Sequence, residues 1–204
     1  MHIATVRLIS QAPYSQSKPH KVPKLNKENP NDYEARTWHN RIHKDGDGVV
    51  IPAMVFKNCL AEAAKFLSIQ IPGKGKSTYT KHFEAGVLVT ESAPIFDHSG
   101  NRIQPPSDEG LKVAAINNKE TVTDAEAKLV EGFNRPSHEV WGDWVFVPSD
   151  GVPGSGKRVW KCYPMIDSWT CEVQFMIMDD VITEDVFLKV LQQAGLLIGI
   201  GRFR

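Results

Sequence analysis

The sequence lacks the features of a secreted, disulfide-linked or membrane-spanning protein. It has only three cysteines among 204 residues, widely spaced and without a Cys-x-x-Cys pair: Cys59, Cys162 and Cys171. This spacing predicts reduced structural thiols and no metal site. No run of 18 apolar residues is present, and the first residues alternate like a strand instead of following the basic-then-apolar order of a signal peptide. We therefore expect a cytoplasmic protein with no membrane partner.

The sequence also lacks the common catalytic and cofactor-binding motifs. No Ser-His-Asp pattern, HExxH or GxSxG is present. Residues 73–78 (GKGKST) resemble a phosphate loop, but Gln70 stands where that motif needs glycine, and the loop is expected to follow a helix and not a strand. The turn at 45–48 (DGDG) is not followed by EF-hand spacing, which argues against calcium. We expect no cofactor and no metal.

Positive and negative charges balance overall but not along the chain. Residues 1–82 carry 13 Lys and Arg against 6 Asp and Glu, whereas residues 83–204 carry 11 against 18. Such asymmetry indicates either a surface that faces a polyanion or head-to-tail self-association of basic and acidic faces. The alternative is that the fold mixes the two halves again.

Apolar patterning predicts the order of the secondary-structure elements. We expect strands at 2–10, 85–91, 170–178 and 198–203, a hairpin of 143–147 with 158–163, and helices at 52–67 and 184–194. Polar segments at about 11–48 and 98–168 interrupt this order as insertions, with short helices expected at 31–38 and 124–130. Without them the order is βαββαβ, which predicts a single α+β domain over residues 1–204 with a modified ferredoxin-like (RRM-like) fold.

The end of the last expected helix is the best pointer to function. It combines three glycines with two cations and an aromatic residue: Gly195, Gly199, Gly201, Arg202, Phe203 and Arg204. Glycine lets another backbone approach closely, and the cations and the aromatic ring suit a phosphate backbone with a base stacked nearby. A glycine helix cap followed by a buried strand would have a similar sequence, and this is the alternative interpretation.

Two basic loops supply further candidate contacts. The loop at 71–82 offers lysines for phosphates and a tyrosine for stacking, and the 11–48 insertion places a tryptophan among arginines. The candidates from these loops are Arg36, Trp38, Arg41, Lys74, Lys76, Tyr79 and Lys81. A solvated loop is the alternative at 71–82, and core or interface packing is expected for most of the five tryptophans.

Three histidines in the basic segments are candidate general bases for a ribose 2′-hydroxyl: His39, His43 and His82. A surface role is the alternative for each, because a loop histidine without a fixed partner is more often solvated. Nothing in the sequence requires an enzyme.

Two segments resemble the RAMP superfamily, the RRM-like proteins that include backbone subunits of CRISPR effector complexes. Residues Ile51-Pro52 followed by Lys57 resemble the Ile-Pro-x-x-x-x-Lys start of that family's first helix. The glycines at 195, 199 and 201 approach its G-x-x-x-x-G-x-G loop, with one residue fewer between the first two. The two insertions resemble its thumb and finger elements. The resemblance implies binding of crRNA or another single strand, side-by-side polymerisation, and backbone contacts from Lys57 and residues 195–204.

The combined expectation is a non-enzymatic protein that binds single-stranded RNA or DNA and assembles side by side as a homo-oligomer or nucleoprotein complex. The sequence does not distinguish RNA from DNA. One alternative is a RAMP-type endoribonuclease that uses one of the three histidines. The other is a phage or mobile-element protein that interacts with a host CRISPR complex and interferes with it.

Overall fold

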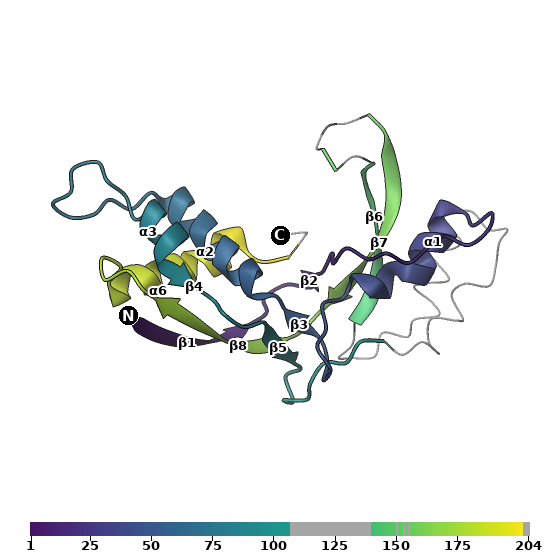
Figure 1. Cartoon of the computed structure of the whole chain (residues 1–204), viewed down its shortest axis with the longest axis horizontal. Helices are drawn as coiled ribbons and strands as arrows, with labels where there is room; N and C mark the ends of the chain where they lie inside the picture. The colour runs from purple at the N-terminus through teal and green to yellow at the C-terminus, as the bar shows by residue number, and fades with distance from the viewer. Residues whose placement is uncertain (107–139, 150, 153, 155, 202–204) are drawn as a thin grey trace. The chain divides into compact units, whose positions relative to one another are not determined.

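The computed structural model describes residues 1–106, 140–149, 151–152, 154 and 156–201. The chain is α+β with antiparallel sheets, and it divides into two compact units (Figure 1). The first unit comprises Met1–Ile9, Val50–Phe96 and Thr170–Arg204, and the second comprises Ser10–Val49 and Asp97–Trp169. The two segments expected to be separate insertions are therefore the segments that form the second unit.

A five-stranded antiparallel sheet forms the base of the first unit. Its strands are β1 (His2–Ile9), β3 (Val50–Ile51), β4 (Val87–Leu88), β5 (Ala93–Phe96) and β8 (Thr170–Ile177). Their order is β1-β8-β5-β3, and β4 also pairs with β8. In the β1–β8 register Ile3 lies opposite Met176 and Val6 opposite Val173. The strands expected at 2–10 and 170–178 are thus confirmed within a residue at each end.

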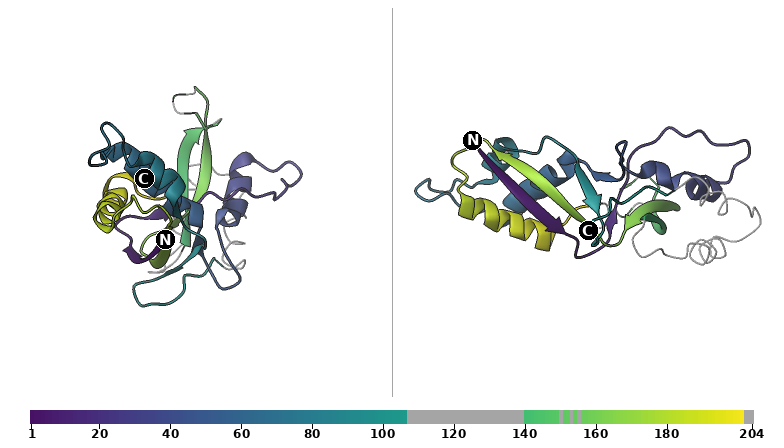
Figure 2. Two further views of the ribbon diagram at one scale, coloured as in Figure 1. Left: turned by 60° about the vertical axis from the view of Figure 1, so that its left-hand side comes forward. Right: turned by 90° about the horizontal axis from the view of Figure 1, so that it is seen from below.

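Three helices of the first unit cover one face of this sheet: α2 (Ala53–Leu67), α3 (Thr80–Gly86) and α6 (Glu184–Gln193) (Figures 1 and 2). The core between helices and sheet is aromatic. Phe187 of α6 stacks on Phe83 of α3 at a centroid distance of 6.5 Å and meets Phe175 of β8 edge-on at 5.5 Å. Phe56 of α2 is also buried. Burying each such ring stabilises the unit by about 1.5–3 kcal/mol.

The last helix continues beyond the residue expected to end it. Thr183 occupies the cap position, but Gly195 lies inside a π-helical turn, Ala194–Ile198, that extends α6. The turn ends at Gly199, whose φ of 68° is available to glycine at little cost. Residues 198–201 form no strand, so the strand expected at 198–203 is wrong over the part that the structure describes.

Two other expected elements need correction, and one cannot be compared. The strand expected at 85–91 is shorter, because α3 runs to Gly86 and β4 covers only two residues. The helix expected at 31–38 is α1 (Pro30–Thr37), capped by Asn29 and not by Asn31. The helix expected at 124–130 lies outside the described residues.

The second unit has its own three-stranded antiparallel sheet, in the order β2 (Tyr14–Ser15), β7 (Arg158–Ile166), β6 (Val140–Pro148). Strands β6 and β7 form the expected hairpin and are longer than predicted. Helix α1 and the 3₁₀ turn that follows it, Trp38–Arg41, pack on β7. A Cβ on Gly142 would lie 2.9 Å from Cys162 Sγ and 3.0 Å from Trp38 Cε2. Glycine at this position therefore lets the indole pack directly on the strand.

Candidate nucleic-acid interface

A buried carboxylate organises the second unit. Glu34 on α1 is 2% exposed, and its oxygens accept hydrogen bonds from Arg41 Nη2 at 2.8 and 3.1 Å and from Lys161 Nζ at 2.6 Å. The Cys162 N–H donates to the same carboxylate at 3.3 Å. Because a buried charge is tolerated only when it is paired and hydrogen-bonded, this cluster fixes the 3₁₀ turn against β7. Arg41 also lies over the ring of Tyr163, 5.3 Å from its centroid.

The segment of residues 16–23 is fastened along α1 and the 3₁₀ turn. Four hydrogen bonds hold it: Lys18 N–H to Arg41 O, His43 N–H to Gln16 Oε1, Tyr33 Oη to Val22 O, and Arg36 Nη2 to Pro23 O, at 2.9, 2.6, 2.8 and 3.0 Å. These bonds satisfy backbone groups of this segment. They hold its side chains next to those of the 3₁₀ turn.

A cavity of about 390 Å³ lies between this segment and the turn. Its lining residues are Lys18, Pro19, His20, Lys21, Val22, His39, Asn40, Ile42 and Lys44. Among the residues that the structure describes, this lining has three lysines and two histidines but no carboxylate. The cavity is therefore electropositive, and its volume falls in the range of about 300–1,000 Å³ typical of small-ligand sites. We call it the basic cavity.

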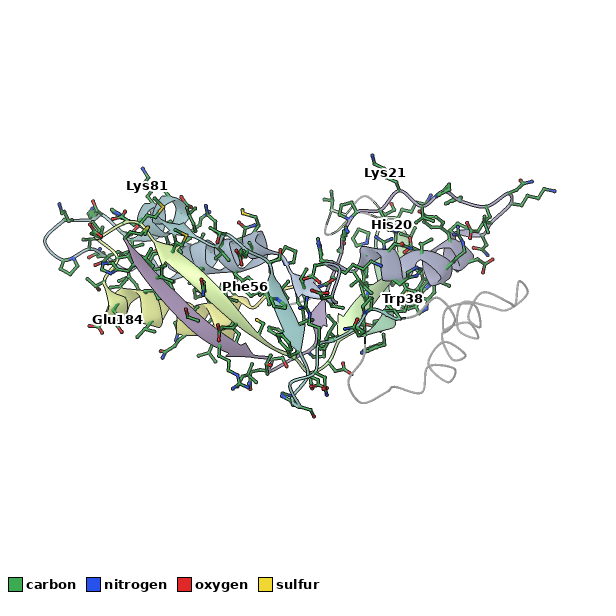
Figure 3. All side chains as sticks on the ribbon, turned by 60° about the horizontal axis from the view of Figure 1, so that its bottom comes forward. His20, Lys21, Trp38, Phe56, Lys81 and Glu184 are labelled. Atoms are coloured by element: carbon green, nitrogen blue, oxygen red, sulfur yellow. The ribbon has the colours of Figure 1, made fainter. Side chains whose placement is uncertain are left out.

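His20 lines the basic cavity, and its surroundings favour the neutral imidazole. Burial lowers the pKa of His20, and the positive charge of Arg41 lowers it further. The ring lies 6.0 Å from that of Tyr33, on the side of the segment that faces α1, whereas Lys21 projects away from the ribbon (Figure 3). Its Nδ1 is buried without a hydrogen-bond partner in the described part of the chain. Because this nitrogen is closed to solvent, a ligand atom could become its partner only after the ring or the segment moves.

Three residues of the second unit predicted to contact nucleic acid are engaged elsewhere. Trp38 is 0% exposed, so no base can stack on it in this structure, and the prediction for Trp38 is corrected. Arg36 Nε donates to Glu28 Oε1 at 2.7 Å, and Arg41 is paired with Glu34. Both guanidinium groups are thus paired with carboxylates of the same unit in this structure.

The lysines of the basic cavity were not among the predicted site residues. Lys18, His20, Lys21 and Lys44 line it, although only His39 had been singled out. His43 lies next to the cavity, and burial together with the charge of Lys18 lowers its pKa. The run Lys18-Pro19-His20-Lys21 carried the signal, since closely spaced cations without an intervening carboxylate indicate a polyanion site.

The first unit has a separate group of exposed lysines. Lys74 and Lys76, two of the predicted phosphate contacts, are exposed in the loop between α2 and α3. Lys81, a third, is exposed on α3 (Figure 3). Tyr79, predicted to stack on a base, is 5% exposed and buried. The Tyr79 N–H donates to Ile69 O at 3.0 Å, which closes the base of the loop and turns the ring inward. Lys57 on α2 is partly exposed.

The glycine-rich segment at the end of α6 packs on α2, the helix that begins after Pro52. The π-helical turn Ala194–Ile198 contacts α2, and Cys59 Sγ lies 3.7 Å from Ala194 O. The two segments that carry the resemblance therefore lie together within the first unit. Gly199 and Gly201 have φ values of 68° and 102°. Arg202, Phe203 and Arg204, the predicted contacts of this segment, lie outside the described residues.

The candidate histidine His82 has a carboxylate partner. His82 Nδ1 lies 2.6 Å from Asp179 Oδ2, and this hydrogen bond lowers the pKa of Asp179. A Cβ on Gly86 would overlap the Asp179 side chain, so glycine at that position allows the approach. Within the part of the chain that the structure describes, no group of three or more His, Cys, Asp or Glu residues could hold a metal ion.

Comparisons of the chain with protein-family models, with curated proteins and with solved structures find no match. No helix among the described residues is both long and apolar enough to cross a bilayer. The features that bear on function are the basic cavity, the exposed lysines and the His82–Asp179 pair.

Proposed function

We propose that this protein binds single-stranded RNA or DNA without cleaving it, and that copies assemble side by side on the strand. The observation that carries this proposal is the basic cavity, whose lining includes three lysines, two histidines and an asparagine and, among the described residues, no carboxylate. Nucleic-acid affinity comes largely from cations placed on phosphates. A surface group of this composition repels cations and attracts a polyanion.

The size of the basic cavity favours a single strand over a duplex. A cavity of about 390 Å³ can take one unstacked nucleotide but not a base pair with its neighbours. The Lys18, Lys21 and Lys44 ammonium groups are the proposed phosphate contacts. His20 and Asn40 are the proposed polar contacts to the base or sugar, because each offers a hydrogen-bonding group at neutral charge.

The strand order of the first unit supports the proposal that this unit has a ferredoxin-like fold similar to that of RAMP proteins. In a βαββαβ fold the antiparallel sheet has the order 4-1-3-2. Strands β1, β8 and the β4–β5 region follow the 1-3-2 part of that order, with all helices on one face. Lys57, Lys74, Lys76 and Lys81 give this unit a second proposed set of phosphate contacts.

Fluorescence anisotropy with a labelled single strand tests the proposal. We expect binding at low salt that weakens steeply as salt rises, because each neutralised phosphate contributes about −0.7 to the slope of log K against log salt. A hairpin duplex of the same composition should bind more weakly. Absence of binding at low salt, or equal binding of strand and duplex, would contradict the proposal.

RNA cleavage is a second candidate function, favoured by the His82–Asp179 hydrogen bond. A carboxylate on Nδ1 orients an imidazole so that Nε2 can act as a general base on a 2′-hydroxyl. Incubation with RNA and with a 2′-deoxy control decides between the two functions. Cutting of RNA alone, lost in His82→Ala, would establish cleavage and replace the non-enzymatic proposal, whereas intact RNA excludes it.

A further inference from the structure

Strand β1 is an open edge of the first unit's sheet. Among the described residues, β8 is the only strand that pairs with β1, across all eight positions from His2 to Ile9. The other side of β1 faces away from the sheet, with α6 running along the same side (Figure 2). A free edge of this length presents a row of unpaired backbone groups that can pair with another strand.

The backbone groups on this edge belong to the odd-numbered residues. The Ser10 N–H donates to Trp169 O, which continues the β1–β8 register, so the even-numbered residues of β1 point their backbone groups toward β8. Met178 N–H donates to Gly86 O on the far side of β8, as the same alternation requires. The N–H and C=O groups of Ile3, Thr5, Arg7 and Ile9 consequently face outward.

The side chains along this edge are unusually apolar for an exposed strand. Ile3 and Ile9 are 61% and 54% exposed on the face of the sheet that carries no helix. Ala4, Val6 and Leu8 lie on the helix-covered face and are partly exposed. Edge strands that stay unpaired usually carry a proline, a bulge or several charges, and Arg7 is the one fully charged side chain among these eight residues.

We propose that β1 pairs antiparallel with β1 of a second copy of this chain, around a two-fold axis at Val6. Residues opposite one another in that register have numbers that sum to twelve. Ile3 then lies opposite Ile9, and Ala4 opposite Leu8. Val6 meets its own copy, and Thr5 lies opposite Arg7. Every apolar side chain meets an apolar one on the same face of a sheet that continues through both copies.

Neighbouring registers are worse for physical reasons. An axis at Arg7 would oppose two guanidinium groups, and an axis at Thr5 would place Arg7 opposite Ile3 and His2 opposite Leu8. A register shifted by one residue would place odd-numbered residues of one copy opposite even-numbered residues of the other. The outward N–H and C=O groups would then not meet, and the helix-covered face of one copy would continue into the open face of the other. Because β1 pairs well with a copy of itself in this register, we propose a second copy of the chain as the partner of this edge. This pairing needs no nucleic acid, so it stands or falls separately from the proposed binding function.

Two substitutions of opposite charge at Thr5 test the register. Because Thr5 lies opposite Arg7 of the partner copy, Thr5→Glu should lower the dimer dissociation constant and Thr5→Lys should raise it, each by about tenfold over the two symmetric pairs. Gln174→Lys is the matched control, since Gln174 is exposed opposite Thr5 on β8 but one strand away from the edge. Sedimentation velocity of nuclease-treated protein over a range of concentrations gives the constants.

Hydrogen exchange provides a readout that does not depend on variants. With rising concentration the Thr5 and Arg7 amides should gain protection, whereas the Val6 amide, already bonded to β8, should not change. A monomer at all concentrations would overturn the proposal. So would a dimer that the Thr5 substitutions leave unchanged, protection of Thr5 in the monomer, or weakening by both Thr5→Glu and Thr5→Lys, which is the signature of an axis at Thr5.

Discussion

Replacing Glu34 with glutamine is expected to lower the free energy of unfolding of the second unit by about 3–5 kcal/mol. The substitution keeps the shape of the side chain but leaves Arg41 and Lys161 without their shared carboxylate. An uncompensated buried charge accounts for most of the loss. The Lys161 side chain is 34% exposed and can turn to solvent, so we expect a value near the lower end of this range. Glu91→Gln, at an exposed loop position of the first unit, should change stability by less than about 0.5 kcal/mol.

The three buried thiols allow the two units to be followed separately. Cys162 lies in the second unit, whereas Cys59 and Cys171 lie in the first. Burial raises the pKa of the Cys171 thiol to about 12 and that of Cys162 well above its usual value, so neither should react before its unit opens. In urea, Glu34→Gln should expose Cys162 to a thiol reagent at a lower concentration than in the wild type, with the first-unit thiols unchanged. Equal shifts for all three cysteines would show that Glu34 does not act locally.

The elements that were predictable from the sequence are those with a local pattern of apolar residues or turn residues. Strands β1 and β8 alternate or run apolar over eight residues, and the β6–β7 hairpin is marked by its glycine- and proline-rich tip. Helix α6 was predictable from its apolar patterning, and its first turn carries Glu184 and Asp185. Its end was not, because the choice between Gly195 and Gly199 depends on packing of the π-helical turn against α2.

The structural role of the 3₁₀ turn could not be predicted, because it depends on contacts between residues far apart in the sequence. Glu34 meets Lys161 at a separation of 127 residues, and Trp38 is buried because Gly142 leaves room for its ring. No local pattern distinguishes an arginine that neutralises a buried carboxylate from one that awaits a phosphate. Lys18 and Lys21 stand in the same insertion, and the only local signal for them was their close spacing without an intervening carboxylate.

Neutralising the basic cavity is expected to have the largest effect on binding. The variant with Lys18, Lys21 and Lys44 all changed to glutamine should lose about 100-fold in affinity for a single strand at low salt, since three surface ion pairs contribute about 1 kcal/mol each. The slope of log K against log salt should become shallower by about 2. The side chains are exposed or partly exposed, so the fold should be retained, with Cys162 still protected from thiol reagents.

The matched control carries the same change of charge in the first unit, with Lys74, Lys76 and Lys81 changed to glutamine. If the strand is held by the basic cavity, this control should lose much less affinity than the cavity variant, although both lose three positive charges. Equal losses would indicate a general charge effect, because net charge acts on any polyanion at a distance whereas a contact acts only where a phosphate sits. A larger loss in the control would move the proposed site to the first unit. His20→Phe separates contact from charge further, since it removes the unpartnered Nδ1 and leaves every lysine in place. It should weaken binding without changing the salt slope.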